Sequence, residues 1–253
     1  MRLTCYTRTF RAEGDARQRP PLIVKGPARK VSLSKLIDET LLEMVNVRNE
    51  PVQVRSSTRI SALVDAAAEV VEEVGVERMT TAMVAERAGA SIGTVYRYFP
   101  DRIAVLSALS LRSMDRFLRQ TRENILREKP ATWIDMMMIA FETSVAMHRT
   151  EVGFTSIRLG DLVSYPDVEP AGIRSVRIAN AFAAIISQDF GLDSTAELTL
   201  HLEMTVNMMD ALLVRAFVSE KDGDDRIITE ARSIVSTYLA SFSEKPAKAA
   251  SKK

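Results

Sequence analysis

The side chains best suited to contact another molecule gather in one run of the sequence, GASIGTVYRYFP, residues 89–100. Hydroxyl groups and a guanidinium follow each other closely there, on Thr94, Tyr96, Arg97 and Tyr98. Such groups hydrogen-bond to phosphate oxygens and to the edges of nucleic-acid bases. Whether these side chains can act together depends on the elements that position them.

Two helices are predicted before this run. Apolar residues recur at every third or fourth position from Thr58, which indicates an amphipathic helix that ends at Gly75. Thr80 or Thr81 can cap the next, shorter helix, which ends at Gly89. The chain must reverse at Gly89 with a positive φ, and that conformation costs little only for glycine.

A third helix of about two turns is expected from Ser91 to Phe99. Its apolar residues recur at intervals of three and four and are expected to face the supporting helices; they are Ile92, Val95 and Phe99. The outward set is Gly93, Thr94, Arg97 and Tyr98. Tyr96 lies on the border between the two faces, where it either packs on the supporting helix or faces outward.

Two short helices joined by a glycine turn, behind a longer helix, make a helix-turn-helix, whose second helix enters the major groove of DNA. Hydroxyls at helix N-termini, such as those of Thr80, Thr81 and Ser91, suit phosphate oxygens. Gly93 has no side chain, so it would let the backbone approach DNA closely. The pattern therefore favours a DNA-binding function.

The stretch TTAMVAERAGASIGTVYRYFPDR (80–102), preceded by RISALVDAAAEVVEEVGVERM (59–79), resembles the DNA-binding domain of the tetracycline-repressor (TetR) family. The matching features are the glycine-ended first helix, the Thr-x-x-x-Val-Ala-x-x-Ala-Gly-x-Ser block, the Thr-Val-Tyr-x-Tyr-Phe run and the Asp-Arg that opens the fourth helix. The resemblance covers roughly residues 57–106. It implies a homodimeric repressor whose C-terminal helical domain binds a small ligand, and binding changes the separation of the two DNA-reading helices.

The resemblance also implies a set of DNA-facing residues: Thr80 or Thr81, Ser91, Gly93, Thr94, Tyr96, Arg97, Tyr98 and Arg102. Tyr96 and Tyr98 would contact phosphates or base edges, and Arg102 a phosphate. Arg102 stands where lysine is common, and Met83 stands where an acid is common. Arg97 has an alternative role, because it can pair with Asp101 four residues on.

The fold class expected for the chain is all-α, with an N-terminal three-helix helix-turn-helix domain and a C-terminal helical ligand-binding and dimerisation domain. The expected boundaries are a basic, mostly disordered extension (1–54) with one short helix (31–47), the DNA-binding domain (55–102), the C-terminal domain (103–243) and a disordered basic tail (244–253). The extension is either native or upstream sequence with Met44 as the true start.

Proline, glycine and capping residues punctuate the C-terminal part. A long helix is expected from Asp101 to about Glu128, and another from Pro170 to about Phe190. The segment 152–167 is expected to hold a short helix between loops. Ser194–Glu197 matches a capping box, which predicts a helix from there to about Glu220. A final helix follows the turn at residues 221–224.

An apolar ligand pocket, or simply core, is indicated by methionine and aromatic residues in this part. The pocket candidates are Trp133, Met137, Phe141, Phe154, Phe182, Met204 and Met208. The helices at about 194–220 and 224–242 are apolar on more than one face. A second copy of the chain is the simplest partner for the additional face, and a two-fold dimer would match a palindromic operator.

Composition argues against other classes of protein. Two histidines and the single Cys5 in 253 residues offer no catalytic constellation and no metal-ligand spacing, so neither an enzyme nor a cofactor is expected. No apolar run is long enough for a membrane span, and we expect a cytoplasmic protein, nucleoid-associated when bound to DNA. A transcriptional activator of the same fold and a helical adaptor that binds no DNA remain as alternatives.

Overall fold

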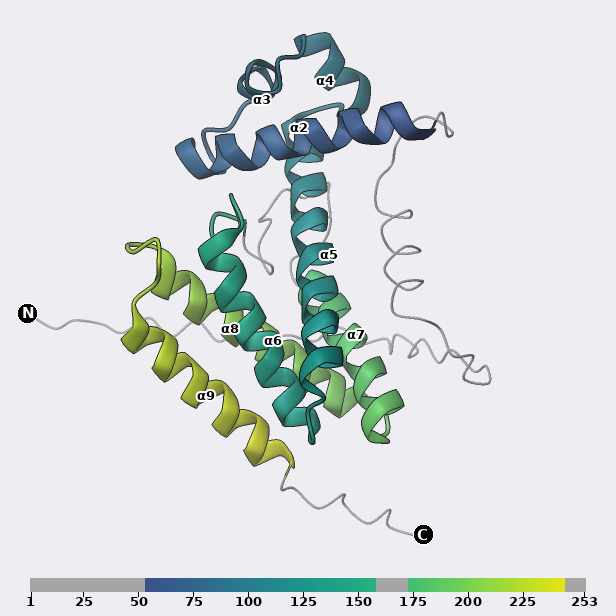
Figure 1. The fold of residues 1–253 in the computed structure, drawn as a ribbon, viewed down its shortest axis with the longest axis vertical. Coiled ribbons are helices and arrows are strands. Elements are labelled where there is room, and N and C mark those ends of the chain that lie inside the picture. Colours follow the sequence, from purple (N-terminus) through teal and green to yellow (C-terminus); the bar gives the residue numbers. More distant parts are fainter. Residues whose placement is uncertain (1–52, 158–172, 244–253) are drawn as a thin grey trace, which may run out of the picture. The chain divides into compact units, whose positions relative to one another are not determined.

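Eight helices and the turns between them make up residues 53–157 and 173–243, which the computed structural model describes (Figure 1). They are α2 (Gln53–Val74), α3 (Thr81–Arg87), α4 (Ile92–Tyr98), α5 (Arg102–Glu128), α6 (Trp133–Thr150), α7 (Ile173–Phe190), α8 (Ala196–Phe217) and α9 (Asp225–Ser243). These described residues contain no strand, which confirms the all-α prediction. None of their helices combines the length and apolar character that a membrane crossing requires.

A first hydrophobic core joins α2, α3, α4 and the first turns of α5. Its fully buried members include Leu63 of α2, Val84 of α3 and Val95 of α4. The long helix α5 contributes Val105 and Leu106 to the same core. The three-helix arrangement expected from the sequence is therefore present, with α5 as a fourth supporting element.

A second hydrophobic core lies among α6, α7, α8, α9 and the later turns of α5. Phe117 of α5 meets Phe182 of α7 edge to face, with ring centroids 6.3 Å apart. Helix α5 has 27 residues and a length of about 40 Å, so one element enters both cores. Figure 1 shows α5 extending from the α2–α4 group to the α6–α9 group. All described residues belong to a single structural unit of the chain.

Two helix starts differ from the prediction. Helix α2 begins at Gln53, five residues before the expected start at Thr58, because no glycine or proline follows Pro51 to interrupt it. Helix α8 begins one residue later than the capping-box match suggests. Its N-cap is Thr195, whose side chain accepts a hydrogen bond from the backbone N–H of Leu198.

Helix α8 also ends at Phe217 rather than at about Glu220. The following turn reaches back, and the N–H of Asp224 donates to the carbonyl of Ala216 at 3.0 Å. This bond satisfies a carbonyl at the helix end, so the chain leaves the helix three residues early. The predicted helix at 31–47, most of the expected short helix in 152–167, the helix start at Pro170 and the tail at 244–253 lie outside the described residues.

Candidate nucleic-acid interface

Local capping fixes the two short helices, as their sequence indicates. Thr80, rather than Thr81, caps α3, since its hydroxyl oxygen accepts from the N–H of Met83 at 3.2 Å. Ser91 caps α4 in the same way and accepts from the N–H of Thr94 at 3.2 Å. Between the helices Gly89 has a φ of +58°, which confirms the glycine turn.

The inner side of α4 is held by its later turn. Val95 is fully buried and Phe99 is nearly so, both in the first hydrophobic core, as predicted. Ile92 is different, because 42% of its surface is exposed. The prediction that Ile92 faces the supporting helices is therefore wrong.

The reason is the position of Ile92 along the helix. It shares a face with Val95, but it is the first residue of a seven-residue helix whose only buried residue is Val95. The first turn of a recognition helix is the part that contacts base edges, and an exposed apolar side chain there suits a thymine methyl group. Ile92 thus joins the candidate interface, which periodicity alone did not indicate.

Tyr96 is outward-facing rather than a border residue. Its side chain is 54% exposed, and its hydroxyl accepts a hydrogen bond from the hydroxyl of Thr81 at 3.3 Å. Thr81 itself is buried, so it does not face a partner directly and acts on the surface only by holding the Tyr96 hydroxyl. The bond ties the outward ring to α3 and limits its freedom before any partner arrives.

Tyr98 takes the border position instead. It is half-buried and packs against the first core, while the guanidinium of Arg97 lies over its ring at 5.8 Å from the centroid. Asp101, the alternative partner of Arg97, uses its carboxylate to cap α5 and accepts from the N–H of Ala104 at 2.8 Å. No ion pair or hydrogen bond joins the described side chains of Arg97 and Asp101, and Arg97 is exposed, as Tyr96 is.

Arg102 lies at the beginning of α5 and binds the loop between α2 and α3. Its guanidinium donates to the carbonyl of Glu77 at 2.7 Å and to that of Val76 at 3.5 Å. These bonds fix the start of α5 against the loop that joins α2 and α3. A phosphate contact by Arg102 stays a prediction, and it would have to form beside or in exchange for these bonds.

The acids of α2 are directed toward protein groups. Arg87 of α3 bridges Glu69 at 3.1 Å and Glu73 at 2.5 Å, and its hydrogen bond lowers the pKa of Glu73. Glu72 accepts from the N–H of Gly153 at 2.9 Å. These partners reduce the repulsion that the three carboxylates would otherwise exert on a phosphate backbone.

The remaining predicted DNA-facing residues are also at the surface of α4. Gly93 is exposed, and only the hydroxyl oxygen of Ser91, at 3.9 Å, would lie near a side chain at this position. Ser91 and Thr94 share a hydrogen bond of 2.9 Å between their hydroxyls. The surface of α4 therefore carries Ile92, Gly93, Thr94, Tyr96 and Arg97. Gly93 lies among the other four and contributes no side chain to this surface.

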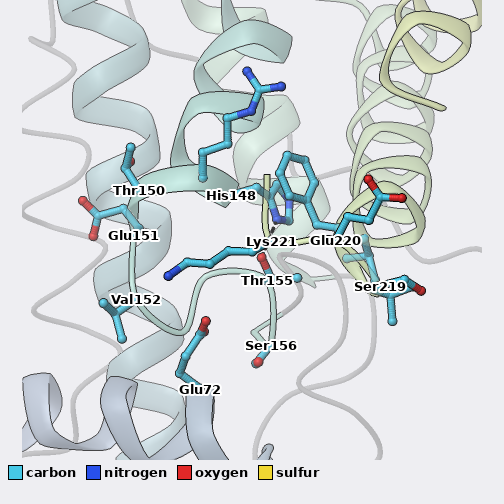
Figure 2. A pocket seen from close by; sticks show the side chains of 14 residues that line it. Glu72, His148, Thr150, Glu151, Val152, Thr155, Ser156, Ser219, Glu220 and Lys221 are labelled. Atoms are coloured by element: carbon cyan, nitrogen blue, oxygen red, sulfur yellow. Dashed lines mark hydrogen bonds between the residues drawn. The ribbon is translucent and has the colours of Figure 1, made fainter. Parts of the chain in front are cut away.

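The predicted ligand-pocket residues lie mostly in the second core. Five of them are buried there: Trp133, Met137, Phe141, Phe154 and Phe182. Met208 is half-buried, and Met204 on α8 is 38% exposed. A cavity of about 560 Å³ lies elsewhere, and none of the seven residues lines it (Figure 2). Within the described ranges no group of acidic, histidine or cysteine side chains could hold a metal ion.

Two family models match the chain. Residues 63–109 match the N-terminal domain of bacterial regulatory proteins of the TetR family. Residues 131–243 match a tetracyclin repressor-like C-terminal domain. The search against curated proteins gave no match.

Solved structures agree with these matches. A TetR-family transcriptional regulator from Streptomyces coelicolor is 28% identical, with a TM-score of 0.63 over 72% of this chain and 98% of that one. The fatty acid degradation regulator FadR from Bacillus halodurans is 15% identical, with a TM-score of 0.55 over 75% and 97% of the two chains. FadR from Bacillus subtilis, solved with stearoyl-CoA, is 18% identical, with a TM-score of 0.54 over 71% and 97%.

A capped, glycine-linked pair of short helices with an exposed second helix, followed by a separate helical core, defines a helix-turn-helix transcriptional regulator. Both parts of this fold match models of one family, in the order that the family requires. The chain belongs to the TetR family of transcriptional regulators.

Proposed function

We propose that the protein is a homodimeric repressor that binds a palindromic operator and is released from it by a small hydrophobic effector. The observation that carries the proposal is the exposed face of α4, where Tyr96 and Arg97 project beside Gly93. These groups can donate hydrogen bonds to bases and phosphates, and the glycine leaves room for the DNA backbone. Its site of action would be the cytoplasm, on the nucleoid when operator-bound.

The proposed dimer interface lies on α8 and α9, which pack against each other. Apolar side chains remain exposed on both helices: Leu200 is 53% exposed, Met204 38% and Ile234 39%. A second copy related by a two-fold axis would cover them and would place two copies of α4 for two operator half-sites.

The proposed effector is small and hydrophobic or amphipathic. Support comes from the apolar second core, which is rich in methionine and aromatic side chains and therefore adaptable. The Bacillus subtilis FadR, which has the same fold, was solved with stearoyl-CoA. An acyl-chain ligand is accordingly the first class to screen.

A gel-shift assay with DNA from upstream of the protein's own gene tests the proposal. We expect a specific complex at low salt that weakens steeply as salt rises, because phosphate contacts release counterions. A folded dimer that gives no shift at low salt would exclude the repressor and favour the helical adaptor. A complex that raises transcription from the bound promoter in vitro would instead favour the activator.

A further inference from the structure

The cavity shown in Figure 2 lies at the junction of the two cores. Glu72 of α2 forms one wall, the end of α6 and the turn at residues 150–156 form the second, and the end of α8 with residues 218–221 forms the third. Its volume of about 560 Å³ is within the range for small-molecule sites.

Most charged groups around this cleft already have protein partners. Glu151 pairs with Arg116 at 2.6 Å, and Arg149 donates to the carbonyl of Asp222 at 2.9 Å. Glu72 accepts from Gly153, as described above. The pKa of the Arg226 guanidinium is raised first by its hydrogen bond to Asp224, and the charge of Glu220 adds a smaller contribution. Glu72, Glu151 and Arg149 are therefore partly satisfied without a ligand, whereas the Glu220 carboxylate has no hydrogen bond or ion pair with another residue that the structure describes.

Of the two basic residues that line the cavity, Arg149 and Lys221, Lys221 is the one without a described partner. Its ammonium has no ion pair or hydrogen bond with any other residue that the structure describes. Figure 2 shows its side chain extending across the cavity. A cationic group is thus available to a ligand within the cleft.

The rest of the lining is apolar or neutral. Phe217 stacks on His148, with ring centroids 4.8 Å apart and planes 13° apart. Burial lowers the pKa of His148 to about 4, so the ring is neutral near pH 7. Val152 and Val214 add apolar surface, and the Ser156 hydroxyl adds a neutral polar group.

We propose that this cleft is an effector site for a small molecule in which a carboxylate is joined to an apolar part. The carboxylate would pair with Lys221, and the apolar part would lie against Phe217 and Val214. The effector role rests on the proposed function, because it requires a protein that binds DNA. The site is separate from the buried residues of the second core that were predicted to line a pocket.

The cleft is also connected to the DNA-binding helices. The turn on its wall places Phe154 in the second core and Ile157 in the first. Between them Gly153 lies so close to α2 that an added Cβ would be 2.9 Å from the carbonyl oxygen of Ala68. A ligand that moves this turn or draws Glu72 away from Gly153 would therefore displace α2, which supports α3 and α4.

The test uses 4-phenylbutyrate as the probe, with 4-phenylbutylamine and 4-phenylbutanol as matched cationic and neutral compounds. Binding to the full-length chain is followed by calorimetry and by thermal unfolding. We expect 4-phenylbutyrate alone to bind saturably and to raise Tm by about 3 °C at ten times its Kd. Lys221→Gln should weaken this binding at least tenfold. Lys129→Gln, at a second cavity, should leave it unchanged.

Three results would overturn the site: no saturable binding of 4-phenylbutyrate, equal binding of the amine or alcohol, or loss of binding in Lys129→Gln rather than in Lys221→Gln. Operator binding is measured separately with and without the probe. Carboxylate binding that leaves operator affinity unchanged refutes the effector role. A chain that binds the probe but no operator refutes the proposed function and leaves the site intact.

Discussion

On the recognition helix, two neighbouring residues have unlike environments although both were candidates for DNA contact. Arg97 is exposed, with its guanidinium over the Tyr98 ring. Tyr98 is half-buried against the first core, so removing its ring would disturb the fold as well as the surface. Arg97 is therefore the cleaner probe of the interface.

We expect Arg97→Ala to weaken operator binding by about 5- to 150-fold, the equivalent of about 1–3 kcal/mol for a good base contact. A gel shift over a range of salt concentrations measures it. A phosphate contact would reduce the salt slope by about one, whereas a base contact would relax specificity at one operator position. Arg122→Ala, an exposed arginine on α5, is the matched control and should leave affinity unchanged.

A buried histidine gives a pH prediction. His148 is 8% exposed, and burial lowers its pKa from 6.5 to about 4 in the folded state. Between about pH 6.5 and pH 4 the unfolded chain binds a proton at this histidine and the folded chain does not, so the free energy of unfolding falls as the pH is lowered through that window. Because of this group, the free energy of unfolding measured in urea should fall by about 2 kcal/mol between pH 7 and pH 5.

His148→Gln removes the titrating group and retains an amide that can bond to Thr155, the present partner of His148 Nδ1 at 3.1 Å. We expect its free energy of unfolding to vary less between pH 7 and pH 5 than that of the original chain. His201→Gln is the comparison variant. An identical pH dependence in His148→Gln and the original chain would show that the folded His148 titrates normally.

At the scale of elements, short-range hydrogen bonds decide where helices begin. Ser194 and Thr195 are adjacent, and both are good N-cap residues by type. The structure assigns the cap to Thr195, which accepts from the N–H of Leu198 at 3.0 Å. The two possible caps would shift the start of α8 by one residue, and the residue types alone do not reveal which of them is used.

The pair of variants Ser194→Ala and Thr195→Ala tests that register. We expect Thr195→Ala to lower the free energy of unfolding by about 1 kcal/mol, since it leaves an N–H of the first turn unsatisfied. Ser194→Ala should change it by less than about 0.5 kcal/mol. Urea unfolding of both variants measures the difference, and the reverse order would return the cap to Ser194.

The turn from α6 toward Ile157 is the second element with a specific requirement. Gly153 has a φ of +77° and lies against the backbone of Ala68, so an alanine there would be strained and would also collide. Backbone atoms cannot rotate away as a flexible side chain can. The requirement for glycine is thus stronger here than at an open turn.

Gly153→Ala should therefore destabilise the protein more than Gly191→Ala does. At Gly191 φ is +69° but no atom lies within 4 Å of an added Cβ, so only the cost of about 1 kcal/mol for the left-handed conformation applies. We expect at least about 1 kcal/mol more for Gly153→Ala. Equal losses in thermal or urea unfolding would mean that α2 and the turn separate easily.

At the scale of the whole molecule, the proposed dimer makes operator binding depend on helices far from α4. Met204 and Leu200 lie one turn apart on α8 and are both exposed. A charge placed between two copies there would be buried without a partner, which is costly. The monomer, in contrast, would keep that charge in water.

Met204→Glu should weaken self-association by at least about 100-fold and reduce operator binding with it, because a monomer holds only one half-site. Sedimentation velocity gives the oligomeric state, and circular dichroism checks the helical content. Leu126→Glu, at an exposed leucine of α5, is the control. A Met204→Glu chain that remains a dimer at low concentration would place the interface elsewhere.

The sequence by itself determined the features that depend on near neighbours. The caps at Thr80 and Ser91 and the positive φ at Gly89 rest on bonds and sterics within a few residues. The inward faces of Val95 and Phe99 follow from helical spacing. Local rules suffice for these features, so the helix-turn-helix was predictable.

Only the tertiary structure decided the features that depend on residues distant in the chain. The bonds of Tyr96 to Thr81, Arg102 to Glu77 and Gly153 to Glu72 join residues 15, 25 and 81 positions apart. The exposure of Ile92 and the cleft around Lys221 likewise depend on how separate helices pack. Periodicity states which face of a helix is apolar, but the length of a neighbouring helix and its point of contact decide how much of that face is covered.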